Sequence, residues 1–304
     1  MDRREFLTRF AAMSAGTAAF FFGKPAMLLG AERSGPYDMA AVLGGSPAGM
    51  FDRGIAELGG IGRYVRRGQT VMIKPNASWG TEPGRGATTT PALVRRVIEH
   101  CIDAGAKKVY VVDHTIDSPN RAYDNNEIGR AAKDGGGQIV PANSRSYYQE
   151  VKVPGARKLK TVHAHEQVLE ADVIINIPIL KHHGSTRITS ALKNLMGLVW
   201  DRWYYHANDL HRCIAEFPLL RTPTLNIVDA HTVMMSGGPR GSSYRAELEV
   251  KRMQIISSDI VAADAAAAKT WGTSTDGVRY ISIAHELGLG NANLDALNIS
   301  RIRV

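Results

Sequence analysis

The segment TTTPALVRRVIEHCIDAGAKKVYVVD constrains the fold of this chain more than any other part of its sequence. Apolar residues recur at helical spacing after Pro91, with Thr89 or Thr90 as the expected N-cap. Gly105 ends that spacing, and an apolar run then leads to Asp113. A shorter apolar run, QTVMIKPN, precedes the segment and has the character of a buried strand. A strand, a helix and a second strand in this order predict a parallel crossover unit.

KRMQIISSD is a further predicted strand, followed by an alanine-rich helix that begins near Asp259. Two other later runs, ADVIINIPI and TPTLNIVDA, are apolar without the alternation of a half-exposed strand. Such runs are typical of the inner strands of a parallel sheet. The sequence therefore predicts an α/β fold with a mainly parallel sheet and helices on both faces. We expect a single α/β domain over residues 32–304, and a division of it into two lobes is left open.

Residues 1–31 have the character of an export signal. Arg3 and Arg4 precede Glu-Phe-Leu, a weakly apolar stretch and then small residues. The apolar stretch, residues 10–22, is shorter than the ~20 residues that a transmembrane helix needs. The paired arginines resemble a twin-arginine signal, which predicts a periplasmic or otherwise exported protein that meets the twin-arginine translocase during export. An amphipathic helix of the folded domain and an uncleaved anchor are the alternatives.

Composition narrows the kinds of partner and cofactor. The formal net charge is +8 at pH 7, and the basic residues are spread along the chain without a long block. No nucleic-acid-binding motif accompanies them, so we expect no nucleic acid as a partner and a small anionic ligand instead. Cys101 and Cys213 are the two cysteines of the chain. They are too few for an iron–sulfur cluster, so none is expected to be intrinsic.

Polar side chains follow several of the predicted strands at the point where each strand ends. They are Lys74 with Asn76, Asp113, Lys181 with His182 and His183, and Asp229. Because the carboxyl ends of parallel strands meet at one edge of a sheet, where ligands bind in open α/β folds, these groups predict a site. Each group also has a structural alternative as a turn or capping residue. Adjacent residues of an extended chain point in opposite directions, so we expect His183 to face the pocket and His182 to be turned away.

The stretch ILKHHGSTRITSALKNLMG is the densest of these polar segments. We expect three of its side chains, Lys181, His183 and Lys193, to share one pocket with Lys74 and Asp229. In that pocket His183 is the predicted general acid or base, and the two lysines of the stretch are predicted to neutralise the substrate or a developing oxyanion. The remaining predicted site residues are the substrate-binding Lys74, Asn76, Asn194 and Asp113 and the candidate metal ligand Asp229.

The order of these motifs resembles a known family. VMIKPN, the helix–strand segment, IINIPILKHH, SALKNLMG, LNIVDA, SGGPRG and SSDIVAADA follow one another over roughly residues 40–295. On these motifs the chain is identified as a member of the bacterial and archaeal family named domain of unknown function 362. Some members carry appended ferredoxin-type cysteine motifs, so the resemblance implies redox work, although this chain has no such cysteines.

A second resemblance is to the nickel-pincer lactate racemase family. In that family a histidine and a lysine lie ten residues apart on one segment near a bound cofactor. His183 and Lys193 have this spacing. The resemblance implies a bound cofactor next to these two side chains, and the identity of any cofactor is unknown from the sequence.

Three interpretations of function remain open. The first is an exported, oxidoreductase-like enzyme that acts on a small anionic substrate with a metal or cofactor, because twin-arginine export often serves proteins that load a cofactor before export. The second is a non-catalytic periplasmic binding protein for an anion or a metal chelate. The third is an accessory subunit of an iron–sulfur redox partner protein, docked through the aromatic residues of GLVWDRWYYHANDLHR. Core packing under a lid is the structural alternative for that aromatic cluster.

Overall fold

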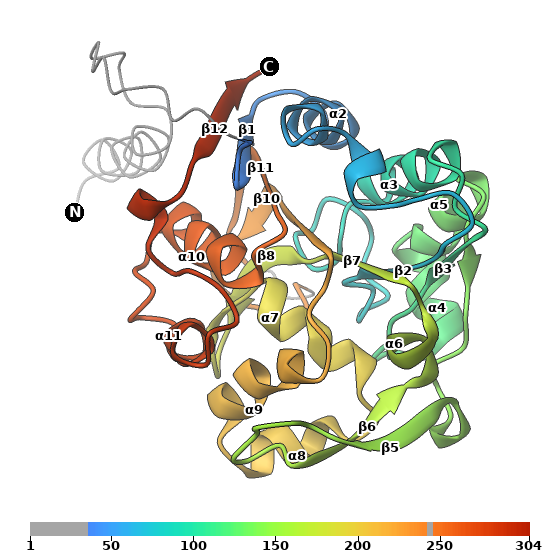
Figure 1. Ribbon diagram of the computed structural model, residues 1–304, viewed down its shortest axis with the longest axis vertical. Coiled ribbons are helices and arrows are strands. Elements are labelled where there is room, and N and C mark those ends of the chain that lie inside the picture. Colours follow the sequence, from blue (N-terminus) through green and yellow to red (C-terminus); the bar gives the residue numbers. More distant parts are fainter. Residues whose placement is uncertain (1–35, 242–245) are drawn as a thin grey trace.

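The computed structural model describes residues 36–241 and 246–304, so the predicted export signal lies outside the described residues. The main sheet contains β1 (Met39–Leu43), β2 (Thr70–Pro75), β3 (Lys108–Val111), β4 (Gln138–Ile139), β7 (Val173–Ile177), β8 (Ile179–His183), β9 (Arg187–Thr189), β10 (Leu225–Met234), β11 (Leu248–Ser257) and β12 (Ile299–Arg303). These ten strands follow the order β12-β1-β11-β10-β7-β2-β3-β4, with β8 paired to β10 and β9 paired to β8 (Figure 1). A separate two-stranded sheet joins β5 (Tyr148–Lys152) to β6 (Thr161–His165).

Most strands of the main sheet run in one direction. β2 is parallel to β3 and β7, β7 is parallel to β10, and β1 is parallel to β12. β11 is antiparallel to both of its neighbours, β1 and β10. The predicted mainly parallel sheet is thus confirmed, and the carboxyl ends of β3, β2, β7 and β10 lie at one edge. The direction of β11 was not predicted, because buried strands of either direction carry the same apolar pattern.

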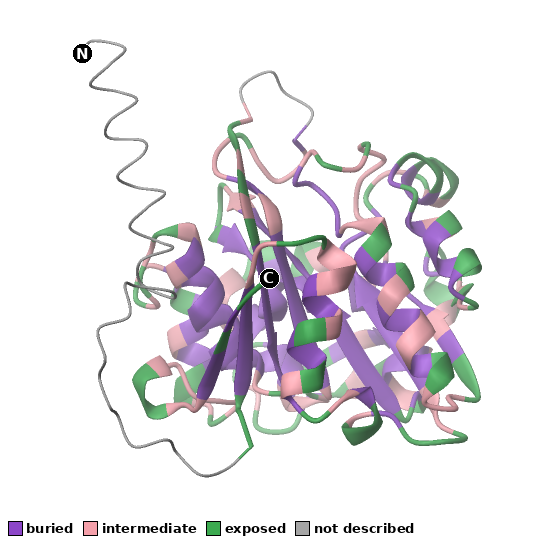
Figure 2. Cartoon of the chain, turned by 90° about the horizontal axis from the view of Figure 1, so that it is seen from above, coloured by how far each residue is buried: buried purple, intermediate pink, exposed green. Residues whose placement is uncertain are grey.

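Helices cover both faces of the sheet, as predicted, so that the buried strands lie between two helical layers (Figure 2). In β2, Val71 and Ile73 belong to the core under one layer, whereas Met72 belongs to the core under the other. This alternation places the Lys74 side chain on the Met72 face. The helices are α2 (Pro47–Glu57), α3 (Pro91–Asp103), α4 (Pro119–Asn125), α5 (Ile128–Asp134), α6 (Glu166–Glu170), α7 (Ala191–Asn194), α8 (Arg202–Ala207), α9 (Leu210–Glu216), α10 (Ile260–Trp271) and α11 (Arg279–Glu286).

Helix α3 shows how the predicted crossover unit is held in place. All five residues of its predicted apolar face are buried, and Pro91 is its first residue. Thr90 occupies the N-cap position, but its hydroxyl makes no capping hydrogen bond. The carboxylate of Asp229, in the middle of β10, instead accepts the Thr90 N–H at 2.8 Å. A strand far away in the sequence therefore supplies the cap that was expected from a threonine.

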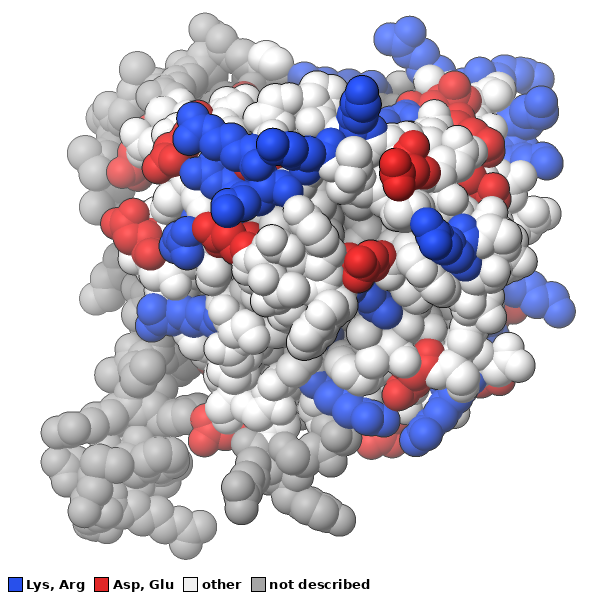
Figure 3. Space-filling model, turned by 90° about the horizontal axis from the view of Figure 1, so that it is seen from below, with Lys and Arg blue, Asp and Glu red and all other residues white. Residues whose placement is uncertain are grey.

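Three general features of the chain concern membrane helices, cysteines and surface charge. Within residues 36–241 and 246–304, no helix is long and apolar enough to cross a membrane. Cys101 and Cys213 are both buried and free. On the face shown in Figure 3, Lys and Arg form one cluster and otherwise lie among Asp and Glu. These charges are solvated, whereas the cationic groups of the candidate site are largely buried.

Candidate functional site

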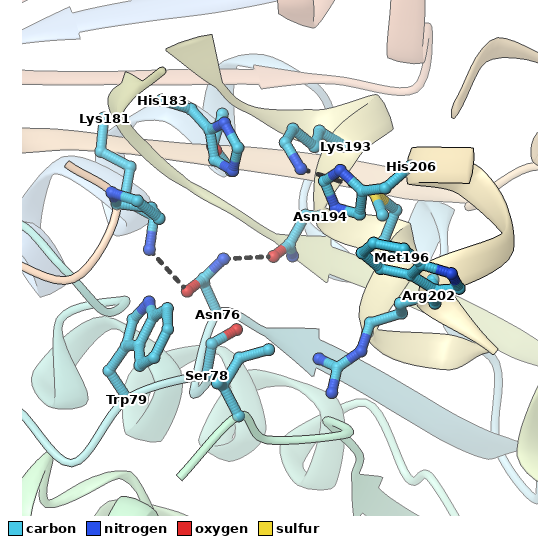
Figure 4. A pocket seen from close by; sticks show the side chains of 15 residues that line it. Asn76, Ser78, Trp79, Lys181, His183, Lys193, Asn194, Met196, Arg202 and His206 are labelled. Atoms are coloured by element: carbon cyan, nitrogen blue, oxygen red, sulfur yellow. Dashed lines mark hydrogen bonds between the residues drawn. The ribbon is translucent and has the colours of Figure 1, made fainter. Parts of the chain in front are cut away.

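A pocket of about 260 Å³ lies at the carboxyl edge of the parallel strands. Five of the predicted site residues line it, namely Asn76, Lys181, His183, Lys193 and Asn194. They come from the segment after β2, from β8 and from α7, and their side chains surround one space in Figure 4. The structure therefore brings together the three residues predicted to be catalytic and two of those predicted to bind substrate.

Strand β8 sets the direction of the histidine pair. It forms an antiparallel hairpin with β9, in which Lys181 lies opposite Thr189. Because side chains alternate along a strand, Lys181 and His183 face the pocket together. His182 does not line the pocket, and its Nδ1 accepts the N–H of Gly238 at 3.2 Å. The expectation that His182 is turned away agrees with this arrangement.

A chain of amide hydrogen bonds forms the floor of the pocket (Figure 4). Lys181 Nζ donates to Asn76 Oδ1 at 3.1 Å, and Asn76 Nδ2 donates to Asn194 Oδ1 at 3.0 Å. Asn194 Nδ2 donates in turn to the Lys74 carbonyl and to Asn176 Oδ1. Each amide is held by partners on both sides, so the floor is rigid and the orientation of Lys181 is defined.

Helix α7 is too short to be stable alone, and a carboxylate from α10 holds its N-terminus. Asp264 Oδ1 accepts the Ala191 N–H at 2.5 Å, and Oδ2 accepts the Leu192 N–H at 3.0 Å. These two bonds satisfy donors that a helix leaves open at its first turn. Lys193 and Asn194 follow directly, so Asp264 fixes the backbone that carries them into the pocket.

Lys74 and Asp113 form a buried ion pair behind the pocket and do not line it. Lys74 Nζ lies 3.0 Å from Asp113 Oδ1, and the other oxygen of Asp113 accepts the Ala77 N–H at 2.6 Å. Gly197 packs on this pair, because a Cβ atom there would lie 2.0 Å from Asp113 Oδ1. The two residues were predicted to bind substrate. The structure instead pairs Lys74 with Asp113 beneath the floor of the pocket, where the Lys74 carbonyl accepts a hydrogen bond from Asn194.

Ten further residues line the pocket, and among them are Trp79, Met196, Arg202 and His206, which the sequence did not single out. Helix α8 carries Arg202, whose guanidinium donates to the carbonyls of His114 (2.7 Å) and Thr115 (3.3 Å). His206 lies one turn further along the same helix. No sequence motif or residue spacing marked Arg202 or His206 as site residues. The only signal in their segment was its high content of aromatic residues.

Burial and neighbouring positive charges perturb the titration of the pocket. Burial lowers the pKa of Lys181 to about 7, and the charges of Lys193 and Lys74 act in the same direction. Burial, with a contribution from Arg202, lowers the pKa of Lys193 to about 8. Burial and the two lysine charges lower the pKa of His183 to about 3, so its imidazole is neutral at neutral pH. Nδ1 of the neutral ring accepts the Ser185 N–H at 3.2 Å, so Nε2 carries the hydrogen and can donate a hydrogen bond.

The prediction that Asp229 shares the pocket needs correction, whereas its role as a metal ligand stays a prediction. Both of its oxygens accept backbone N–H groups, of Thr90 and His231, and the residue does not line the pocket. These two backbone hydrogen bonds account for the Asp229 carboxylate in the middle of β10. Among the residues that the structure describes, no group of three or more His, Cys, Asp or Glu side chains could hold a metal ion.

Fold and pocket together define an α/β protein with a cationic pocket at the carboxyl edge of its parallel strands. The chain belongs to the family described as Domain of unknown function (DUF362), whose model matches residues 71–269. The match extends from β2 into α10, so it contains every residue predicted for the site.

One relative and two solved structures are similar to this chain at low sequence identity. A thylakoid-associated protein of Synechocystis sp. is 26% identical over 227 residues, which cover 70% of this chain and 69% of that protein. The lactate racemase apoprotein of Thermoanaerobacterium thermosaccharolyticum is similar with a TM-score of 0.44 at 11% identity, over 66% of this chain and 51% of that chain. A Thermotoga maritima protein has a TM-score of 0.48 at 11% identity, over 77% of this chain and 60% of that chain. The chain thus spans only about half to three fifths of the two solved structures.

Proposed function

We propose that this protein is an enzyme that binds a small anionic substrate in the pocket lined by Lys181, Lys193 and Arg202. The observation that carries this proposal is the charge of the lining. Among the described residues that line the pocket, none is Asp or Glu. The nearest buried carboxylate, Asp113, is committed to Lys74. Buried positive charges without a carboxylate are unfavourable, and an anionic ligand would compensate them.

The roles of the side chains follow from their contacts. Lys181 is oriented by Asn76, and Arg202 is oriented by two backbone carbonyls, so both cations are preorganised to hold an anion. His183 is neutral at neutral pH, its Nδ1 accepts the Ser185 N–H, and its Nε2–H can donate a hydrogen bond to the bound anion. An anion would also raise the pKa of the lysines, because a negative charge favours their protonated form.

Binding can be tested by thermal denaturation and calorimetry with inorganic phosphate, lactate and pyruvate at low ionic strength. A ligand that binds only the folded state raises the melting temperature in proportion to the logarithm of its concentration. We expect at least one of these anions to stabilise the wild type, and Arg202→Gln to reduce the effect. Lys133→Gln, a change of an exposed lysine on α5, is the matched control and should bind as the wild type does. Absence of stabilisation by all three anions would contradict the proposal.

Turnover separates an enzyme from a binding protein. A pocket that catalyses proton abstraction would exchange a carbon-bound hydrogen of lactate or pyruvate with solvent deuterium, which proton NMR detects. We expect exchange with the wild type and none with His183→Gln. A protein that binds an anion but exchanges no carbon-bound hydrogen in lactate or pyruvate would favour the alternative, a non-catalytic binding protein for an anion or a metal chelate.

Export through the twin-arginine route is a second part of the proposal and is supported by the Arg3-Arg4 pair. Cell fractionation should find the wild type in the exported fraction and the Arg3→Lys, Arg4→Lys double variant in the cytoplasm. Arg9→Lys is the control within the same segment. An unchanged distribution of the double variant would contradict export by this route. Oxidoreductase chemistry and docking on an iron–sulfur partner stay predictions from the sequence.

A further inference from the structure

Lys193 differs from the other buried lysines of the site in its partners. Lys74 Nζ is paired with Asp113, and Lys181 Nζ donates to Asn76 Oδ1 and to the Ala87 carbonyl. Lys193 Nζ has the Met196 sulfur as its hydrogen-bond partner, at 3.4 Å. A thioether is a weak acceptor, so this amine is held far less tightly than the other two.

The Lys193 amine is also directed into the pocket. The residue is 8% exposed and lines the cavity beside Asn194, and Figure 4 shows its amine near the His206 ring. The pKa of His206 is lowered, by burial first and then by the charge of Lys193. The pKa of His183 is lowered by the same two causes. Two imidazoles that favour the neutral form therefore lie within electrostatic range of an amine that has no oxygen acceptor among the described residues.

We infer that Lys193 is a nucleophile that forms an imine with the carbonyl carbon of a 2-oxo acid. The inference rests on the proposed function, because the carboxylate of the 2-oxo acid is the anion that Lys181 and Arg202 hold. A carboxylate bound by these cations brings the adjacent carbonyl into the pocket that Lys193 lines. Lysines in buried, cationic surroundings are the ones that act as Schiff-base nucleophiles.

The chemistry needs no further reactant. The neutral amine nitrogen attacks the carbonyl carbon, and the carbonyl oxygen takes up a proton to give a carbinolamine. The nitrogen lone pair then forms the C=N bond while the hydroxyl leaves as water. Both hydrogens of the neutral amine leave in that water, so nothing is oxidised or reduced. The protonated imine draws electrons from the neighbouring carbon and makes the hydrogens on that carbon more acidic.

The mouth of the pocket indicates the side chain of the 2-oxo acid. Trp203 and Ile116 line it and are 75% and 50% exposed. Large apolar side chains exposed at a pocket mouth favour an apolar group on the ligand. We therefore expect phenylpyruvate to react to a greater extent than pyruvate.

The test is reductive trapping on the full chain. The protein is incubated with pyruvate or phenylpyruvate, reduced with sodium cyanoborohydride, and analysed by intact mass and peptide mapping. We expect one adduct per chain, located on Lys193 and absent from Lys193→Met, while Lys133→Gln is labelled like the wild type. Propanal, which has the carbonyl but no carboxylate, should label Lys193 about tenfold less.

The outcomes separate this inference from the proposed function. If pyruvate stabilises the protein but forms no adduct on Lys193, the inference that Lys193 is a nucleophile is wrong. The proposal that the pocket binds an anion would still hold. An adduct on Lys181, or labelling spread over surface lysines, would overturn it as well. Equal labelling by propanal and pyruvate would show that the carboxylate is not recognised, and would count against both. Circular dichroism of Lys193→Met establishes that loss of the adduct is not loss of the fold.

Discussion

Replacement of Lys193 by methionine is expected to stabilise the protein at neutral pH. The variant keeps the length of the side chain and removes a buried charge that has a sulfur atom as its partner. The pKa of Lys193 falls from 10.5 to about 8, chiefly through burial. Each tenfold change in proton affinity corresponds to about 1.4 kcal/mol, so the charged form destabilises the fold by up to about 3 kcal/mol. Relaxation of the site reduces this ceiling, and we expect a gain of about 1–3 kcal/mol.

The stability gained by Lys193→Met is expected to depend on pH. Between pH 8 and pH 10.5 the unfolded chain binds a proton at Lys193 that the folded chain has lost. The contribution of Lys193 to stability therefore rises with pH across this range. The advantage of Lys193→Met should be largest below pH 8 and should nearly vanish at pH 10.5.

Urea unfolding at pH 7 and at pH about 10 measures this difference as a free energy of unfolding. Lys133→Met, on the exposed surface of α5, is the control and should change stability by less than ~0.5 kcal/mol at either pH. A Lys193→Met variant that is less stable than the wild type at pH 7 would refute the reasoning. It would mean that the Lys193 ammonium is well solvated or well paired in the folded protein.

Three further predictions concern the residues behind the pocket, and each is measured by urea unfolding. Asp113→Asn leaves the Lys74 ammonium buried without its partner and should cost about 3–5 kcal/mol, so a loss below ~1 kcal/mol would count against the pair. Gly197→Ala places a Cβ 2.0 Å from Asp113 Oδ1 and should cost about 1–3 kcal/mol, whereas Gly62→Ala, with nothing within 4 Å, should be neutral. Burial raises the pKa of Asp264 from 3.8 to about 6, so its contribution to stability is present below pH 3.8 and is lost as pH rises through 6. The wild type should therefore gain up to about 3 kcal/mol over Asp264→Asn as pH falls from about 7 to about 4, and parallel pH profiles would contradict this.

The cationic pocket also explains why the site is not optimised for stability. Lys181, Lys193 and Arg202 each have a lowered pKa, with burial as the first cause. A protein selected only for stability would replace such groups by apolar residues or pair them with carboxylates. Destabilising features that persist in a pocket are typical of functional sites, where the ligand supplies the missing interaction.

The sequence by itself determined the parts of this protein that depend on local pattern. Helical spacing and apolar runs predicted α3, the inner parallel strands and the edge at which their carboxyl ends meet. Alternation along a strand predicted that Lys181 and His183 would face one way and His182 the other. These properties repeat every two to four residues, so a single stretch of sequence contains them.

Only the tertiary structure decided which polar groups form hydrogen bonds and ion pairs with each other. Asp229 caps α3 across 139 residues of sequence, and Asp264 caps α7 across 73 residues. Lys74 is paired with Asp113 behind the floor, while Arg202 joins the pocket from a helix that no motif marked. A buried donor must find an acceptor wherever the fold brings one near, and that proximity is a property of the packed chain. For this reason the sequence indicated the edge of the sheet where the site lies, and the packing selected the residues that line it.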